Sequence, residues 1–132
     1  MKKNLYFLAA FIFVFILSSC SSEENNPVQP PPKTYDVEYK LSGSVSEINQ
    51  INYLAANGQL LHDSLVTPSW SYQWTSKGKE GQQTSLEAVL VKQSGKLLLE
   101  ILADGNHLVN DSISGIPGGR IMITRSITLP YE

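Results

Sequence analysis

Apolar and polar residues alternate with a period of two over most of the chain after residue 34. In the stretch 35–43 the apolar residues are Tyr35, Val37, Tyr39 and Leu41, and polar or charged residues separate them. Successive side chains of a strand point to opposite faces, so this alternation predicts a half-buried strand. No segment shows the sustained 3.6-residue apolar period of an amphipathic helix. The sequence therefore predicts an all-β domain.

Turn sequences divide this region into seven or eight short strands. The clearest are Asn57-Gly58, which favours a type I′ hairpin turn, and Asp104-Gly105. Residues 86–91 and 97–103 are expected to pair as a hairpin across Gln93-Ser94-Gly95. So many short strands in roughly 100 residues predict an antiparallel β-sandwich of Ig-like size, with a small closed barrel as the alternative. The predicted strands cover residues 35–43, 51–56, 60–66, 70–75, 86–91, 97–103, 108–113 and 121–129.

The first 19 residues have a different composition. A basic start, Met1 to Asn4, is followed by an apolar run from Leu5 to Leu17. A run of about 13 residues fits the apolar region of a signal peptide, whereas a membrane-spanning helix needs about 20. The sequence predicts a cleaved signal peptide over residues 1–19.

Leu17-Ser18-Ser19-Cys20 resembles the lipobox of bacterial lipoproteins. The resemblance implies cleavage before Cys20, a diacylglycerol on its thiol and a fatty acid such as palmitate on its new amino group. Cys20 is the only cysteine, so no disulfide can form within the chain. One acyl chain holds a protein only marginally, whereas two or three give a stable anchor. The alternatives are an ordinary secretory signal with a chance cysteine and an uncleaved anchor.

The residues after Cys20 predict a tether and a location. Ser21, Ser22, Glu23 and Glu24 resemble the acidic export signal of surface-exposed lipoproteins in some Gram-negative bacteria. That resemblance implies the outer face of the outer membrane, with its periplasmic face as the alternative. The rest of the segment 20–33 is polar and proline-rich, which favours an extended, semi-rigid spacer. The domain then covers residues 34–132.

The charge of the chain excludes one class of partner. Loss of residues 1–19 would remove two of the ten basic residues and leave twelve acidic ones, so the net charge would be near −4. A chain of this charge without a basic stripe is not expected to bind nucleic acid.

The strand pattern also resembles the MmpS family, which comprises small membrane-anchored β-sandwich proteins that serve as accessory subunits of lipid and siderophore exporters. The resemblance implies the same fold and, as one function, a role in an envelope export complex. The anchor differs, because that family has a transmembrane helix, and its disulfide cysteines are absent. The matching residues are Val37-x-Tyr39-x-Leu41-x-Gly43, Ile51-x-Tyr53, Asn57-Gly58, Pro68-x-Trp70, Leu86-x-Ala88 and Ile101-x-x-Asp104-Gly105.

Trp70, Tyr72 and Trp74 have the spacing of one face of a strand. Turned outward, they would form a platform on which sugar rings stack. That orientation would bury the opposite face, Ser71, Gln73 and Thr75, at a cost of about 1–3 kcal/mol for each unpaired polar group. Burial of the aromatic face is therefore expected.

No catalytic or metal site is predicted. His62-Asp63-Ser64 contains the residue types of a catalytic triad, but neighbours on a strand point to opposite faces. His62 and His107 lack the spacing of zinc ligands. Asp104 and Asp111 flank a turn where Ca²⁺ is an alternative to plain solvation. The chain is therefore expected not to be an enzyme and to carry no cofactor except the lipid on Cys20.

Three further features are candidates for function or need explanation. Ser64 and Ser112 each lie in an Asp-Ser-apolar sequence, which resembles the acceptor of a bacterial O-glycosylation system. Arg125 interrupts the apolar register of the last strand, which indicates a bulge or an edge position. If residues 86–91 and 97–103 pair, four apolar side chains would share one exposed face and form a partner-binding patch: Val89, Val91, Leu98 and Leu102.

These observations favour a lipid-anchored binding module of the bacterial envelope, whose partner is another envelope protein or an external ligand. An accessory subunit of an exporter and a glycan-binding surface lipoprotein are the alternatives.

Overall fold

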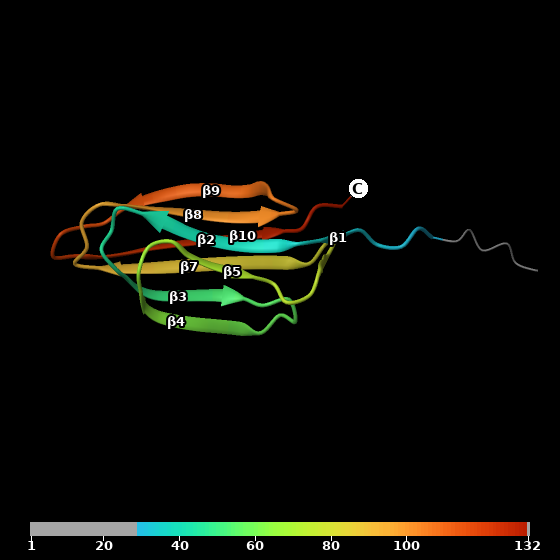
Figure 1. Cartoon of the computed structure of the whole chain (residues 1–132), viewed down its shortest axis with the longest axis horizontal. Helices are drawn as coiled ribbons and strands as arrows, with labels where there is room; N and C mark the ends of the chain where they lie inside the picture. The colour runs from blue at the N-terminus through green and yellow to red at the C-terminus, as the bar shows by residue number, and fades with distance from the viewer. Residues whose placement is uncertain (1–28, 132) are drawn as a thin grey trace, which may run out of the picture. The chain divides into compact units, whose positions relative to one another are not determined.

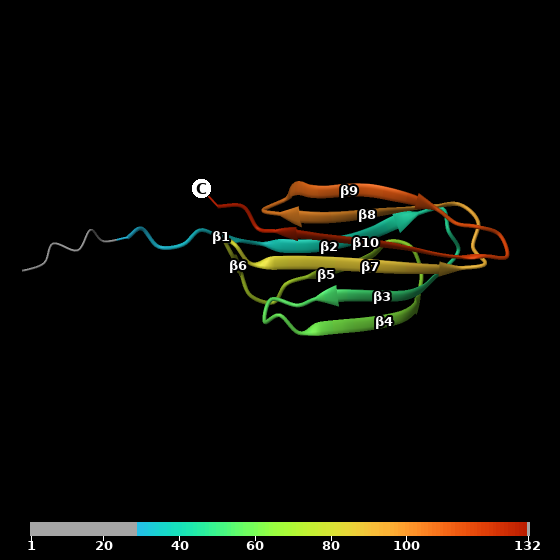
Figure 2. The ribbon, with the colours of Figure 1, turned by 180° about the vertical axis from the view of Figure 1, so that it is seen from behind.

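The computed structural model describes residues 29–131, and the compact unit within them begins at Pro31. This unit contains only strands and loops, and every strand pair is antiparallel, which confirms the all-β prediction (Figures 1 and 2). The strands are β1 (Thr34–Tyr35), β2 (Val37–Gly43), β3 (Ile48–Leu54), β4 (Leu60–Val66), β5 (Trp70–Gln73), β6 (Gly78–Lys79), β7 (Gln83–Val91), β8 (Lys96–Ala103), β9 (Asn106–Ser114) and β10 (Arg120–Thr128).

The strands form two sheets of four that pack face to face. Sheet I has the order β10-β7-β3-β4, sheet II has the order β5-β2-β8-β9, and β1 pairs with β6 in a small third sheet. Two separate four-stranded sheets make a sandwich, so the closed-barrel alternative is wrong. The two-residue strands β1 and β6 were not expected from the sequence, because two residues are too few for alternation to be visible.

The predicted hairpin between residues 86–91 and 97–103 does not form. β7 pairs with β10 and β3 in sheet I, whereas β8 pairs with β2 and β9 in sheet II. The connecting loop crosses from one sheet to the other and uses positive φ angles at Lys92 and Gly95. The inner face of each of the two strands is apolar, and the alternation of residues reveals that face. It does not specify which other strand lies beside them. Their pairing is thus a property of the whole sandwich.

The inner faces of both sheets supply the core. Val37, Tyr39 and Leu41 of β2 are fully buried, as are Leu97, Leu99 and Ile101 of β8. Sheet I contributes chiefly Ile51, Leu86, Ala88, Leu90 and Ile123. Burial of this apolar area is the main term that stabilises the fold.

The two halves of the sandwich have the same connections. β2 and β5 pair with each other and enclose the β3–β4 hairpin, which lies in the other sheet; β7 and β10 enclose the β8–β9 hairpin in the same way. The sequence repeats across these hairpins, as Tyr-Leu-Ala-Ala-Asn-Gly and Asp-Ser-Leu in 53–65 and as Ile-Leu-Ala-Asp-Gly and Asp-Ser-Ile in 101–113. The second hairpin has one more residue between its turn glycine and its aspartate, and the β8–β9 register shifts between Ile101 and Leu102. This is the mark of a β-bulge.

The strand directions give the sandwich two different ends. The chain enters at β1, and β2 runs from there to the opposite end, which we call the far end. Because neighbouring strands are antiparallel, four connections meet at the far end: residues 44–47, 67–69, 92–95 and 115–119. Figures 1 and 2 show these loops on the side away from β1.

Candidate functional site

Hydrogen bonds tie the far-end loops to one another. The Ser44 N–H donates to the Lys96 carbonyl oxygen at 2.8 Å, and the Lys96 N–H donates to Ser44 Oγ at 3.0 Å. The Lys92 N–H donates to the Gly119 carbonyl oxygen at 2.6 Å. Gly43 is required in this arrangement, because a Cβ there would lie 2.1 Å from the Lys96 carbonyl oxygen. The far end is therefore a connected surface in which loops from both sheets hold each other.

Two adjoining depressions lie on the outer face of sheet II beside these loops; together we call them the distal groove. One, of about 400 Å³, is lined by Ser42, Gly43, Ser44, Lys96 and Leu98. The other, of about 250 Å³, shares Ser42 and is lined chiefly by Lys40, Ser69, Trp70, Ser71 and Glu100. The strand register places these residues together, because Lys40 of β2 lies opposite both Ser71 of β5 and Glu100 of β8.

The distal groove offers serine hydroxyls, the ammonium groups of Lys40 and Lys96, and the Glu100 carboxylate. Lys40 Nζ lies 3.0 Å from Glu38 Oε2, and Glu100 Oε1 lies 3.3 Å from His107 Nδ1. Lys96 makes no ion pair among the residues that the structure describes. Serine hydroxyls donate and accept hydrogen bonds, and an ammonium group donates three. The groove is thus suited to a polar ligand that carries hydroxyl or anionic groups.

The three aromatic residues lie on the core side of the sandwich, as the sequence predicts. Trp74 is buried, and Trp70 and Tyr72 are half-buried and pack against the core. The Tyr72 ring stacks on Tyr39 and tilts against Tyr53, with centroid separations of 6.3 Å and 4.6 Å. They therefore form no outward platform, although Trp70 also borders the distal groove.

Asp63 closes the edge of the sandwich between β4 and β5. Its Oδ2 accepts hydrogen bonds from Tyr53 OH and from Trp70 Nε1, both at 3.1 Å. Burial, and then the hydrogen bond to Asp63, raise the pKa of Tyr53 to about 12. His62, on the opposite face of β4, has its Nδ1 3.0 Å from Asn52 Oδ1. The expected separation of His62 from Asp63 is confirmed, and the pair cannot act as a base and its orienting group.

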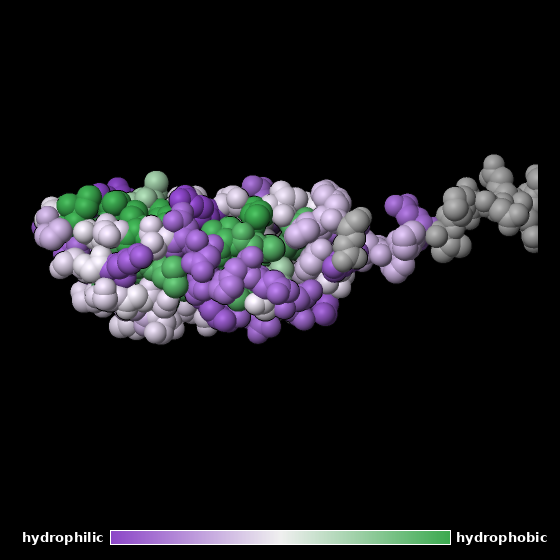
Figure 3. Space-filling model, turned by 90° about the horizontal axis from the view of Figure 1, so that it is seen from above, coloured by the Kyte–Doolittle hydropathy of each residue, from purple (hydrophilic) through white to green (hydrophobic). Residues whose placement is uncertain are grey.

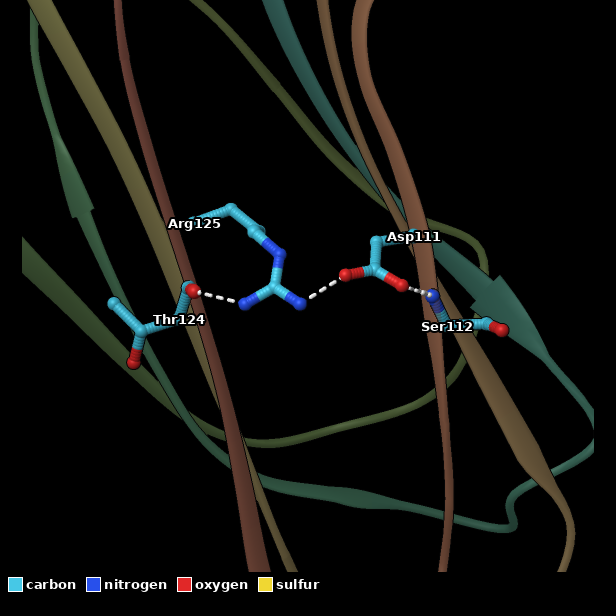
Figure 4. A network of polar contacts seen from close by, with 4 residues as sticks. All are labelled: Asp111, Ser112, Thr124 and Arg125. Atoms are coloured by element: carbon cyan, nitrogen blue, oxygen red, sulfur yellow. Dashed lines mark hydrogen bonds and ion pairs between the residues drawn. The ribbon is translucent and has the colours of Figure 1, made fainter.

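Arg125 and Asp111 close the opposite edge, between β9 and β10. The register places Arg125 opposite Leu86 and Asp111 opposite Leu99, so both strands present these charges on their inner faces. Figure 4 shows the guanidinium of Arg125 between the Thr124 carbonyl oxygen and the Asp111 carboxylate, whose other oxygen accepts the Ser112 N–H. These hydrogen bonds, that of Ser112 first, lower the pKa of Asp111. Of the two alternatives predicted for Arg125, the edge position is confirmed and the bulge is wrong, because β10 is an edge strand that pairs with β7 in unbroken register.

The two aspartates of the calcium alternative are not brought together. Asp104 Oδ1 accepts the Asp36 N–H at 2.7 Å at the end of the sandwich nearest β1, whereas Asp111 pairs with Arg125 along β9. Within residues 29–131, no group of three or more His, Cys, Asp and Glu side chains is placed to hold a metal ion.

The serines of the two Asp-Ser-apolar sequences lie on equivalent strands. Ser64 is exposed on β4, and Ser112 is half-buried on β9. The preceding aspartates, Asp63 and Asp111, make the two contacts that close the sandwich edges. These contacts give each aspartate a structural role that does not depend on modification of the serine beside it. O-glycosylation at the two serines stays a prediction.

The predicted apolar patch is wrong. Val89 and Val91 lie on the outer face of sheet I, whereas Leu98 and Leu102 lie on the outer face of sheet II, so the four residues cannot share one surface. Val89 is only 2% exposed and Leu102 only 5%. Both lie on central strands, where cross-strand neighbours cover them; Val89, for example, has Met122 on one side and Gln50 on the other. On the face that Figure 3 shows, apolar areas (green) are interrupted by hydrophilic ones (purple).

The predicted anchor and export signal, Cys20 and Ser21, Ser22, Glu23 and Glu24, lie outside the described residues. Between residues 29 and 131 the chain has no helix that is long and apolar enough to cross a membrane.

The distal groove was not foreseen from the sequence. Its residues come from three strands and from the two loops that hold Ser44 and Ser69, and they meet only because β2 lies between β5 and β8. Serine and lysine near strand ends are ordinary in sequence, so no pattern marked Ser42 or Lys96 in advance.

Comparison of the sequence with known families finds no family model that matches, and comparison with curated proteins finds no match. The resemblance to the MmpS family therefore stays a prediction from the strand pattern.

Proposed function

We propose that this chain is a non-catalytic binding module of a bacterial envelope, held by lipid on Cys20 and displayed on the outer face of the outer membrane. The observation that carries the binding role is the arrangement of the sandwich ends. The chain enters at β1, and the cross-linked loops and the distal groove lie toward the opposite end. A domain that is tethered at one end presents the other end to a partner.

Loop surfaces on rigid scaffolds commonly carry binding sites. Here the Ser46 hydroxyl of loop 44–47 donates a hydrogen bond to Gln93 Oε1 of loop 92–95, and the Ser44–Lys96 hydrogen bonds tie loop 44–47 to the start of β8. Little loop entropy would therefore be lost on binding. The partner would be another envelope protein or an external ligand. An export-complex subunit is a special case of the first, and genetic linkage to a transporter would support it.

Labelling with palmitate tests the anchor. Cells that express the full chain should incorporate label into the protein, and the Cys20→Ser variant should incorporate none and leave the membrane fraction. A wild-type protein without label, free in solution, would contradict the anchor. Protease added to intact cells separates the two membrane faces, because only a surface-displayed domain is digested.

A second candidate is glycan binding at the distal groove. It is favoured by the serine hydroxyls of Ser42, Ser69 and Ser71 beside the partly exposed Trp70. A glycan array probed with the wild-type chain and with Lys96→Ala tests it. If the wild-type chain binds a glycan and Lys96→Ala binds it more weakly, the result supports an acidic glycan in the groove. If no glycan binds, a protein partner is the better candidate for the groove. Ser64→Ala, on an exposed strand of the other sheet, is the matched control.

A further inference from the structure

The four edge strands of the sandwich differ in how well they are protected against pairing with another strand. β5 has only four residues, β4 carries Leu65 at a φ of 54°, and the β9 register is broken by the shift at Ile101. A short edge strand, a residue whose φ angle distorts the strand, and a β-bulge each disfavour pairing with the edge of another sheet. β10 has none of these features: its nine residues pair with β7 in unbroken register, and the strand contains neither proline nor lysine.

The charge of Arg125 protects β10 only in part against pairing with another strand. Arg125 points inward, and an inward charge normally opposes the approach of another strand. Here the Asp111 carboxylate neutralises the guanidinium within the same molecule. The outer face of β10 also carries Met122, which is 54% exposed. The backbone edge of β10 is therefore long and regular and carries no net charge at its centre, where the Thr124 carbonyl oxygen already accepts a hydrogen bond from Arg125 Nη1 and keeps a second lone pair for a further donor.

The sequence of β10 is compatible with pairing to itself. An antiparallel two-fold pair centred on Thr124 places Thr124 opposite its copy, Met122 opposite Ser126 and Ile121 opposite Ile127. Arg125 then faces Ile123, and Arg120 faces Thr128. No like charges are opposed in this register. A register centred on Arg125 would instead place two guanidinium groups opposite each other, which is destabilising.

From this edge we infer that β10 is the docking strand for β10 of a second copy of this chain, in the antiparallel register centred on Thr124. Pairing would join the two copies of sheet I into one eight-stranded sheet, because each copy contributes its four strands. The partner is thus a second copy, and the inference does not depend on the ligand of the distal groove.

A charge pair placed across the predicted register tests the inference. The double variant Met122→Lys, Ser126→Lys puts introduced lysines directly opposite each other twice, whereas Met122→Lys, Ser126→Glu puts a lysine opposite a glutamate at the same two sites. Sedimentation of the full chain in density-matched detergent should give a dimer for the wild type. The lysine–lysine variant should dissociate with a Kd at least tenfold higher, and the lysine–glutamate variant should remain dimeric. Circular dichroism melts of all three establish that each is folded.

Crosslinking gives a second test of the same register. With Thr124→Cys, a mild oxidant should yield a disulfide-linked dimer, because directly opposed residues of an antiparallel pair have Cα separations that a disulfide can span. The matched control is Ser64→Cys on the β4 edge, and the wild type, whose only cysteine is Cys20, gives the background. A monomeric wild type, equal behaviour of the two charge variants, or equal crosslinking at positions 124 and 64 would overturn the inference.

Discussion

Asp63 and Asp111 occupy equivalent positions in the two hairpins of this domain, and each closes one edge of the sandwich. Asp63 accepts hydrogen bonds from Tyr53 and Trp70 at the β4–β5 edge. Asp111 pairs with Arg125 at the β9–β10 edge. Both lie in the inner rows of edge strands, where apolar residues would be expected. The repeated Asp-Ser-apolar sequence therefore marks a repeated structural device, in which a carboxylate links the two sheets.

Removal of the Asp63 carboxylate should destabilise the domain. Asp63→Ala leaves the half-buried Trp70 Nε1–H and Tyr53 O–H without an acceptor, and a buried unsatisfied donor costs about 1–3 kcal/mol. Asp63→Asn keeps an acceptor oxygen and should cost less. Urea unfolding measures both variants, with Ser64→Ala, exposed on the same strand, as the control. Equal stability of Asp63→Ala and Ser64→Ala would contradict this role.

The Asp111 carboxylate should make the domain sensitive to acid. The pKa of Asp111 is lowered in the folded state, so the carboxylate contributes stability above its unfolded pKa of 3.8. That contribution is lost as the pH falls from 3.8 through the lower pKa of the folded state. The Asp111→Asn variant lacks it at every pH. Urea midpoints of the two proteins, measured from pH 6 to pH 2, should therefore differ at pH 6 and converge in acid; a constant difference would contradict the assignment.

Buried tyrosines should make the domain sensitive to alkali. Burial raises the pKa of Tyr39 to about 12, and burial with the Asp63 hydrogen bond raises that of Tyr53 to about 12. A pKa raised above the unfolded value of 10.0 gives stability that is complete below pH 10 and is lost between pH 10 and 12. Tyrosinate absorbance should rise in two phases, the later one together with unfolding by circular dichroism. Tyr39→Phe should reduce the second phase, and a single phase near pH 10 would show that both hydroxyls are accessible.

Leu98 and Leu102 should respond differently to serine. Leu102 is 5% exposed, so Leu102→Ser removes buried apolar area and adds a buried hydroxyl, at a cost of about 2–4 kcal/mol. Leu98 is half-buried beside the distal groove, and Leu98→Ser should cost less than about 1 kcal/mol. Urea unfolding of the two variants makes the comparison. Equal effects would mean that Leu102 is less well covered than its exposure indicates.

The fold class follows from the amino-acid sequence alone, because the alternation of residues such as Val37, Tyr39 and Leu41 has the period of a strand and of no other element. The alternation also shows that Trp70, Tyr72 and Trp74 face the core, since polar residues alternate with them. For Arg125 it left a bulge and an edge position as alternatives.

Which strands are neighbours depends on how the two sheets are assembled. A period of two specifies the inner face of a strand but not the strand beside it, so residues 86–91 and 97–103 lie in different sheets although they are adjacent in the chain. The predicted patch failed for that reason. The distal groove arose for the same reason, since Ser42, Ser71 and Lys96 share a surface only once β2 lies between β5 and β8.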